Sequence, residues 1–299
     1  MKPAMIIHGG AGSGKFGRRD ARFRELRNAL EEGMAALKKG SSLDGVEASV
    51  RYMESCGAFN AGRGACLTAE GTLQLDAAVM QGDGRKGAGV GAVKCTYNPV
   101  SLARWVMENT GHVLVVGEEC KVLANAAGLK VERLVPSPGS SQKYRKLVAA
   151  RTGRNAGNYE FWKKMQDGNT VGAVAIDSAG MASAAVSTGG MWLKLPGRVG
   201  DSAVLGAGIY ADSAGASCAT GTGEEIIKNA LAWNTGEFLK STDAAGAARK
   251  AIALMSRRSG KGSAGIITVD AKGRVGFAYN TEAMGRAWCD QDGRSFVRV

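Results

Sequence analysis

Apolar residues return every three or four positions between Asp20 and Lys38, which predicts an amphipathic helix that stops at Gly40. The same spacing predicts a second helix from Val46 to Glu54. Further helices are expected over residues 99–108, 118–127, 222–233 and 243–255. Short apolar or alternating runs predict strands at residues 4–8, 72–80, 87–93, 112–116, 171–176, 181–187, 203–205, 265–269 and 274–279. Groups of strands and of helices in this order indicate an α+β fold.

The region from Pro136 to Asn169 breaks this pattern. It is rich in Ser, Gly, Lys and Arg and has no long apolar period, which predicts a mobile linker over residues 137–169. A buried strand then begins abruptly at Thr170. A hydroxyl at the start of a buried strand, with a loop before it, is a place where a chain could cut itself.

Such a cut would make Thr170 an N-terminal residue, whose own α-amine could act as the base for its hydroxyl. A free α-amine has a pKa of about 7.7–8.0, so part of it is neutral at pH 7. This chemistry needs no histidine. The alternative reading of Thr170 is a β-prone residue that simply opens a strand.

The composition excludes several other classes. Six cysteines show no Cys-x-x-Cys pairing, so zinc is not expected, and without a visible signal peptide they indicate reduced thiols and a cytoplasmic location. No apolar run is long enough for a membrane span. His112, one of two histidines, lies between apolar neighbours and is expected to be a buried structural residue.

The net charge of +12 raises the question of nucleic-acid binding. The densest excess falls on the predicted linker, where residues 137–169 carry 7 basic and 2 acidic side chains, a net charge of +5. Few aromatic side chains accompany it, so we expect no nucleic-acid partner. The charge favours solubility and mildly attracts anionic substrates.

The first strand leads into a glycine-rich segment, residues 8–14, that is expected to be a loop whose backbone approaches another group closely. The spacing of Gly9, Gly14 and Lys15 also matches a phosphate-binding loop. Phe16 stands where such a loop needs Ser or Thr for Mg²⁺. A nucleotide-binding protein that uses Gly9–Lys15 is therefore an alternative function from a different class.

Five short motifs follow one another closely after the linker. They are Thr170-Val-Gly-Ala-Val-Ala-Ile-Asp177, Ser187-Thr-Gly-Gly190, Gly197-Arg-Val-Gly-Asp-Ser202, Gly206-Ala-Gly-Ile-Tyr-Ala-Asp212 and Thr220-Gly-Thr-Gly-Glu224. Upstream and downstream stand His8-Gly-Gly-Ala-Gly12, Phe59-Asn-Ala-Gly-Arg-Gly64, Asn98-Pro-Val-Ser-Leu-Ala-Arg104 and Asn280-Thr-Glu-Ala-Met284. In this order they resemble the threonine-type N-terminal-nucleophile (Ntn) amidohydrolases, which include plant-type asparaginases, isoaspartyl aminopeptidases, glycosylasparaginases and threonine aspartase.

The resemblance covers nearly the whole chain and implies a particular architecture. Residues 1–299 would form a single domain with the four-layer αββα sandwich of the Ntn-hydrolases. Autoproteolysis would divide it into an α chain, 1–169, and a β chain, 170–299, with a homodimer of αβ units as the assembly. Relatives usually have Gly or Asp before the nucleophile, whereas this chain has Asn169, which puts the rate of cleavage in question.

The resemblance also implies a role for each matching residue. The catalytic residues would be Thr170 as nucleophile, Thr188 as its hydrogen-bond partner, and Thr220 with Gly221 as oxyanion hole. Substrate would be bound by Arg198 at its α-carboxylate, by Asp201 at its α-ammonium, and by Gly223 through close contact. Supporting residues would be Asn60, Gly9 and Gly10.

The activity implied is hydrolysis of L-asparagine and of β-aspartyl (isoaspartyl) dipeptides through an acyl-threonine intermediate. A glycosylasparaginase-type amidase is the alternative within the same class. No cofactor is required. The backbone carbonyls of Met53, Glu54, Phe59 and Asn60 match a loop that surrounds a structural sodium ion in relatives, and oxygen ligands suit that hard cation.

Overall fold

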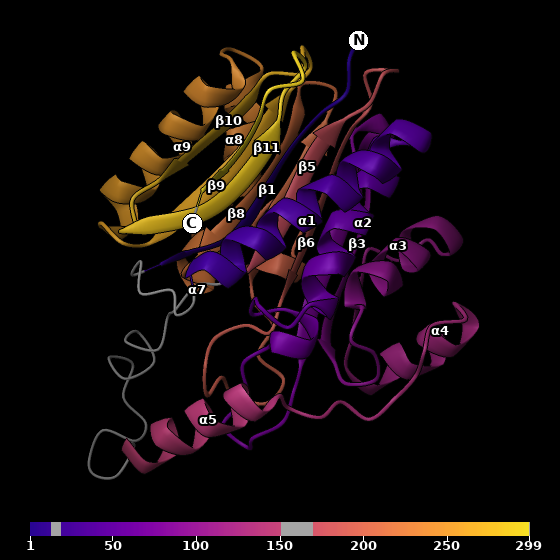
Figure 1. The fold of residues 1–299 in the computed structure, drawn as a ribbon, viewed down its shortest axis with the longest axis vertical. Coiled ribbons are helices and arrows are strands. Elements are labelled where there is room, and N and C mark those ends of the chain that lie inside the picture. The colour runs from indigo at the N-terminus through magenta and orange to yellow at the C-terminus, as the bar shows by residue number, and fades with distance from the viewer. Residues whose placement is uncertain (13–18, 151–169, 299) are drawn as a thin grey trace.

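Two β-sheets packed face to face form the centre of the molecule (Figure 1). The computed structural model describes residues 1–12, 19–150 and 170–298. The strands of the larger sheet, in spatial order, are β12 (Ser295–Arg298), β11 (Ala283–Cys289), β1 (Ala4–Gly12), β5 (Val171–Ile176), β6 (Ala182–Thr188), β2 (Leu75–Gln81), β3 (Lys86–Val93) and β4 (Leu114–Val116). The strands of the smaller sheet are β10 (Val275–Tyr279), β9 (Ala264–Asp270), β8 (Gly215–Gly221) and β7 (Ile209–Asp212). Among the strands that the structure describes, only β3 and β4 pair in parallel.

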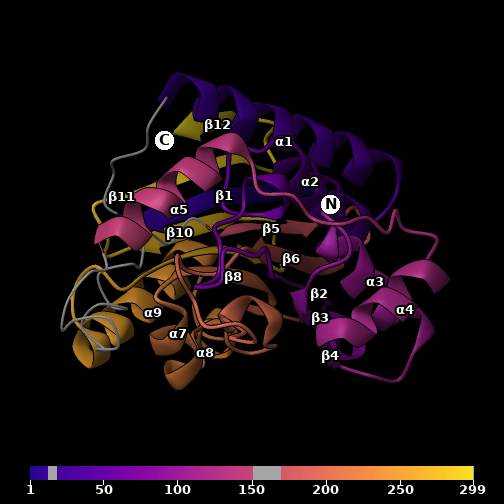
Figure 2. The same ribbon diagram turned by 90° about the horizontal axis from the view of Figure 1, so that it is seen from below.

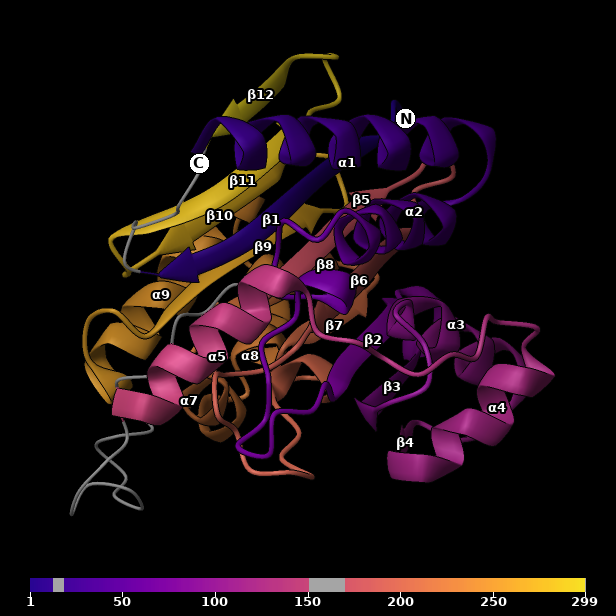
Figure 3. The ribbon, with the colours of Figure 1, turned by 60° about the horizontal axis from the view of Figure 1, so that its bottom comes forward.

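Helices cover the outer faces of both sheets (Figures 1 and 3). α1 (Arg19–Lys39) and α2 (Ser42–Ser55) lie on the larger sheet. α8 (Leu231–Leu239) and α9 (Ala244–Ser259) lie on the smaller one, preceded by the short α7 (Gly223–Asn229). The other helices within the described ranges are α3 (Pro99–Asn109), α4 (Cys120–Ala126) and α5 (Pro138–Ala150). Short 3₁₀ turns lie at Gly62–Gly64, Asp83–Arg85, Gly117–Glu119 and Asp201–Ala203.

The alternation of side chains along each strand explains the two cores. On β1, Met5 and Ile7 pack with the helices, whereas Ala4 and Ile6 face the smaller sheet. Every residue of β5 is buried. A strand covered on both faces reads as a continuous apolar run rather than an alternating one, which is how residues 171–176 stand out in the sequence.

Most predicted elements are confirmed, with shifts of a few residues at their ends. The helix predicted over residues 222–233 is in fact two helices, because Ala230 adopts a left-handed backbone (φ 44°) between α7 and α8. The strand predicted at 203–205 is replaced by a 3₁₀ turn and loop. Strands β7, β8, β11 and β12 were not predicted. Strands β7 and β12 have only four residues each, and β8 and β11 contain several Gly, Ala or Cys residues, so the apolar signal of all four is weak.

Three further expectations are wrong where the structure describes them. Residues 9–12 do not form a loop, because β1 continues to Gly12 through an irregularity in its pairing between His8 and Ala11. Residues 138–150 of the predicted linker form helix α5; the rest of that linker, 151–169, lies outside the described residues. His112 is exposed rather than buried.

The helix α5 is held in place by a few specific contacts. The Ser140 hydroxyl donates to the Ala65 carbonyl (3.1 Å), and the Tyr144 hydroxyl donates to that of Ala69 (3.1 Å). The Lys143 ammonium lies over the Trp192 ring, 4.9 Å from its centroid. In the described part of the chain, no helix combines the length and the apolar character that crossing a bilayer requires.

Candidate active site

Thr170 and Thr188 meet where two buried central strands end. The pairing of β5 with β6 sets Val171 opposite Ser187, so the residue before one strand faces the last residue of the other. The two hydroxyl oxygens are 3.2 Å apart and hydrogen-bonded. Only 6% of Thr170 and 2% of Thr188 is exposed, so the surrounding protein excludes most water.

The turn after Thr188 is fixed by Asn60. The Gly190 N–H donates to the Thr188 hydroxyl (3.0 Å), while the Asn60 side chain donates to the Gly190 carbonyl (2.6 Å). The Asn60 carbonyl accepts the Gly189 N–H (2.9 Å), and its side-chain oxygen accepts the Cys66 N–H (2.8 Å). Asn60 thus holds the loop that orients Thr188.

Gly9 and Gly10 directly follow the end of the pairing between β1 and β5. The last pair of that register is His8 opposite Gly172, which lies two residues after Thr170. Gly10 has φ of 107°, a conformation that favours glycine. A Cβ on Gly9 would stand 2.6 Å from the Phe59 ring, so the close approach also needs glycine there.

Thr220 and Gly221 end strand β8 on the facing sheet. The Ala11 N–H donates to the Thr220 hydroxyl oxygen (3.3 Å), which leaves the hydroxyl proton free to point elsewhere. Gly221 has φ of 142°, and a Cβ there would lie 2.3 Å from the Ser263 carbonyl oxygen. The Thr220 hydroxyl and the Gly221 N–H are thus two donors at the end of β8, next to the end of β1.

The loop between β6 and β7 brings Arg198 and Asp201 together with Gly223. A Cβ on Gly223 would stand 2.6 Å from Nη2 of Arg198 and 2.9 Å from Oδ1 of Asp201, so only glycine fits. The guanidinium donates through Nε to Oε1 of Glu224 (3.0 Å), and its Nη2 forms an ion pair with the same oxygen at 2.8 Å. Glu224 was not singled out from the sequence, although it ends the last of the five motifs.

Burial sets the charge state of Asp201. The residue is 4% exposed, and its Oδ2 has no hydrogen-bond partner among the described residues. Burial raises the pKa of Asp201 to about 7, although the nearby positive charge of Arg198 opposes the shift. An incoming cation would favour the ionised form of this carboxyl.

His8 lies fully buried near the same strand ends. A Cβ on Gly172 would stand 2.4 Å from its Nε2, so the imidazole rests directly on the backbone of β5. Burial lowers the pKa of His8 to about 3, and the Thr170 backbone offsets this only in part. His8 is therefore neutral, and sequence reasoning had named it only as a strand end.

The loop after α2 turns its backbone oxygens toward two glycines. A Cβ on Gly62 would lie 2.3 Å from the Glu54 carbonyl oxygen, and one on Gly64 would lie 2.2 Å from that of Phe59. The Met53 carbonyl accepts the Cys56 thiol (3.5 Å), and that of Asn60 is taken by Gly189. Within residues 1–12, 19–150 and 170–298, no three acidic, histidine or cysteine side chains gather into a metal site.

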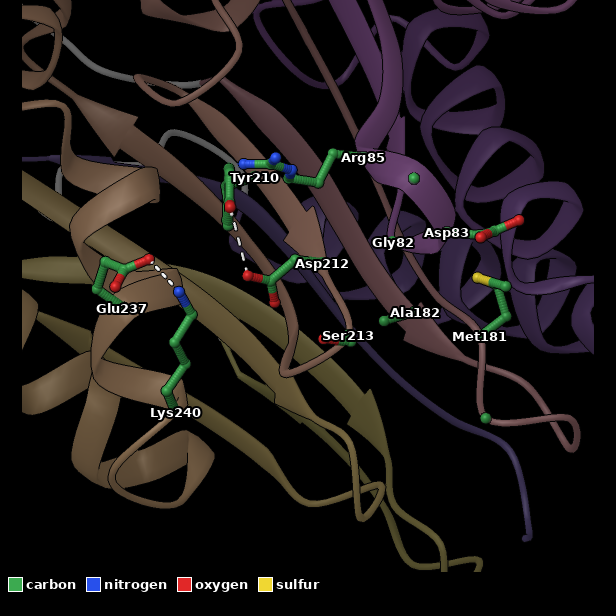
Figure 4. A pocket seen from close by; sticks show the side chains of 12 residues that line it. Gly82, Asp83, Arg85, Met181, Ala182, Tyr210, Asp212, Ser213, Glu237 and Lys240 are labelled. Atoms are coloured by element: carbon green, nitrogen blue, oxygen red, sulfur yellow. Dashed lines mark hydrogen bonds and ion pairs between the residues drawn. The ribbon is translucent and has the colours of Figure 1, made fainter.

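A cavity of about 720 Å³ lies at the other ends of the strands (Figure 4). Met181 and Ala182 line it where β6 begins, and Tyr210 and Asp212 line it where β7 ends. None of the predicted site residues borders this cavity. The two predicted positions Asn169 and Lys15 lie outside the described residues.

Comparison with known proteins gives consistent results over the full length. A family profile described as asparaginase matches residues 1–298. A plant-type L-asparaginase of Pyrobaculum calidifontis is 42% identical over 95% of this chain and 96% of its own. A plant-type L-asparaginase of Pyrococcus abyssi is 40% identical over 95% of each chain, and an isoaspartyl peptidase of Escherichia coli is 41% identical over 96% of this chain and 92% of its own.

The raised pKa of Asp201 predicts a specific dependence of stability on pH. The folded state holds the proton of Asp201 more tightly than the unfolded state does. The free energy of unfolding therefore falls as pH rises from about 4 to about 7. Asp201→Asn should remove that loss and raise the free energy of unfolding at pH 8 by on the order of 1–3 kcal/mol. Urea unfolding of both proteins from pH 4 to 8 measures it, with the exposed Asp292→Asn as control. Parallel pH profiles for wild type and Asp201→Asn would contradict the assignment.

Proposed function

Because the chain belongs to the asparaginase family, it is a hydrolase of the L-asparaginase and isoaspartyl-peptidase kind, and we propose that Thr170 is its nucleophile. The substrates are L-asparagine and β-aspartyl dipeptides. The observation that carries the proposal is the buried hydrogen bond between the Thr170 and Thr188 hydroxyls, at the end of two paired strands. In this buried setting few water molecules compete for the Thr170 hydroxyl, so its hydrogen bond to Thr188 fixes its direction.

The first step is cleavage of the chain itself. The Thr170 hydroxyl attacks the Asn169 carbonyl carbon, the peptide C–N bond breaks, and the nitrogen takes the hydroxyl proton. Water then opens the resulting ester and releases the carboxylate of Asn169. The new α-amine of Thr170 is the base that the uncut chain lacks. The products are an α chain, 1–169, and a β chain, 170–299.

The same hydroxyl then attacks the substrate. The α-amine takes the proton as the oxygen bonds to the side-chain carbonyl of asparagine, and it passes that proton to the departing ammonia. The Thr220 hydroxyl and the Gly221 N–H stabilise the oxyanion, and such fixed donors contribute about 2.7–4 kcal/mol each. Water finally hydrolyses the acyl-Thr170 ester and releases aspartate.

Arg198 and Asp201 select the substrate. Glu224 holds the guanidinium by Nε and Nη2, which leaves Nη1 and the second Nη2 proton for the α-carboxylate. The buried carboxylate of Asp201 receives the α-ammonium, whose arrival supplies the missing countercharge. Gly223 keeps both groups accessible because any side chain there would contact them.

Other features of the assembly belong to the same proposal. The succession of helix pair, large sheet, small sheet and helices supports a four-layer αββα sandwich of the Ntn-hydrolase type in a single domain. A cytoplasmic homodimer of αβ units remains our expectation. The carbonyls of Glu54 and Phe59 beside Gly62 and Gly64 fit a backbone-oxygen site for Na⁺, with no catalytic part.

The nucleotide-binding alternative has less support. Residues 9–12 continue strand β1, whereas a phosphate-binding loop would leave the strand there to wrap a phosphate. Gly9 packs directly against the Phe59 ring, which occupies the space beside its backbone that a phosphate would need.

Substitution of Thr170 tests the nucleophile. Thr170→Ala should abolish hydrolysis of L-asparagine and of a β-aspartyl dipeptide, because no hydroxyl remains to form the ester. Thr170→Ser should retain activity at a reduced kcat. It keeps the hydroxyl but loses the methyl group that restricts the rotation of the side chain. Ammonia release measures both. The matched control is Thr110→Ala, since the Thr110 hydroxyl donates to the Val106 carbonyl at the end of α3 and accepts the His112 N–H. Full activity in Thr170→Ala would exclude the mechanism.

Arg198→Lys tests the clamp. A lysine carries the charge but cannot hold Glu224 and a carboxylate with one planar group, so kcat/KM should fall by about tenfold to a hundredfold, mainly through KM. The exposed Arg294→Lys should leave both constants unchanged. Steady-state kinetics with L-asparagine decide the matter, and a wild-type KM in Arg198→Lys would remove Arg198 from the substrate site.

A further inference from the structure

A fully buried ion pair lies beneath the loop that carries the site. Lys194 and Asp76 each have no exposed side-chain surface, and Nζ of Lys194 is 3.5 Å from Oδ2 of Asp76. Among the described residues, Nζ makes no hydrogen bond. An ammonium with three donors is rarely buried in this way, because desolvating it is costly unless its charge has a use.

Lys194 is anchored at its backbone and reaches back under the turn after Thr188. Its carbonyl accepts the Ala69 N–H (2.9 Å), and its own N–H donates to the Met191 carbonyl (3.3 Å). A Cβ on Gly190 would stand 2.8 Å from Cδ and 2.9 Å from Nζ of this lysine. The side chain therefore supports the peptide whose N–H donates to the Thr188 hydroxyl.

Asp76 connects the same point to the substrate loop. It lies directly opposite Thr188 in the pairing of β2 with β6. Its Oδ1 accepts the Ala92 N–H (2.9 Å), and its Oδ2 accepts the Gly200 N–H (3.1 Å), one residue before Asp201. The carboxylate thus joins strand β3 to the loop of Arg198 and Asp201, while the backbone of the same residue lies opposite Thr188.

We propose that the Asp76–Lys194 ion pair is a positioning device that fixes the Thr188 turn and the Arg198–Asp201 loop relative to each other. This inference rests on the proposed function, because it assigns those two segments to nucleophile and substrate. Neither residue touches substrate. Each of the two carboxylate oxygens of Asp76 accepts one N–H group, which a single amide oxygen at this position could not do for both.

The test separates positioning from folding by neutralising the pair. Lys194→Met and Asp76→Asn each leave one buried charge uncompensated, so both should lower the Tm. The double variant buries no charge and should recover most of that loss. In the double variant, the single amide oxygen introduced by Asp76→Asn still cannot accept both the Ala92 and the Gly200 N–H. The Lys194→Met change also removes the Nζ that packs against Gly190.

We expect the double variant to melt cooperatively, with a Tm close to that of wild type. Its kcat for L-asparagine should fall by about a hundredfold, the loss expected when reacting groups are misplaced by about 1 Å. Lys194→Met should act mainly on kcat, through the Thr188 turn. Asp76→Asn should also raise KM, since it loosens the loop that carries Asp201. Lys94→Met, which breaks an exposed ion pair with Glu118, is the matched control and should change neither constant.

Two results would overturn the inference while leaving the proposed function intact. The first is a double variant with wild-type Tm and kcat within about twofold of wild type, which shows that the pair serves folding alone. The second is a double variant that does not fold, which assigns the same purely structural role. A wild-type protein that hydrolyses neither substrate would instead overturn the proposed function, and this inference with it.

Discussion

The antiparallel pairing of β5 with β6 is the constraint on which the rest of the site depends. It sets the backbones of Thr170 and Thr188 side by side at the ends of two buried strands, and the turn after Thr188 then orients the Thr188 hydroxyl. Two packed sheets cover these strands, and the end of the second sheet delivers Thr220 and Gly221. The reacting groups are consequently held by backbone hydrogen bonds of the core, which are the most rigid part of the molecule.

The dry surroundings make charge the second determinant. Asp201, Lys194 and Asp76 are all buried, and burial is costly for each unless a partner of opposite sign is present. Lys194 and Asp76 compensate each other's charge, whereas Oδ2 of Asp201 has no hydrogen-bond partner among the described residues. His8, by contrast, is neutral, because burial lowers its pKa. Under the proposed function, the carboxylate of a zwitterionic substrate would bind Arg198 and its ammonium would bind Asp201.

The sequence predicts the positions of the central strands well and the surrounding elements less completely. The apolar run at 171–176 and the period of residues 20–38 are dictated by burial, so they appear in both sequence and structure. Helix α5 was missed because its contacts are polar, such as Tyr144 on the Ala69 carbonyl, and leave no apolar period. The short motifs single out Thr170 with Thr188 and Arg198 with Asp201, and the structure brings each pair together. Lys194 and Asp76 carry no local signal, because their ion pair joins residues far apart in the chain.

Intact-mass measurement of the purified wild-type protein tests the central claim most directly. The account predicts two chains, residues 1–169 and 170–299, the second beginning Thr-Val-Gly-Ala, whereas Thr170→Ala keeps the single mass of 1–299. Asn169 before the cleavage point affects only how fast the two chains form. A wild-type protein that remains one uncut chain and still hydrolyses L-asparagine at full rate would contradict it.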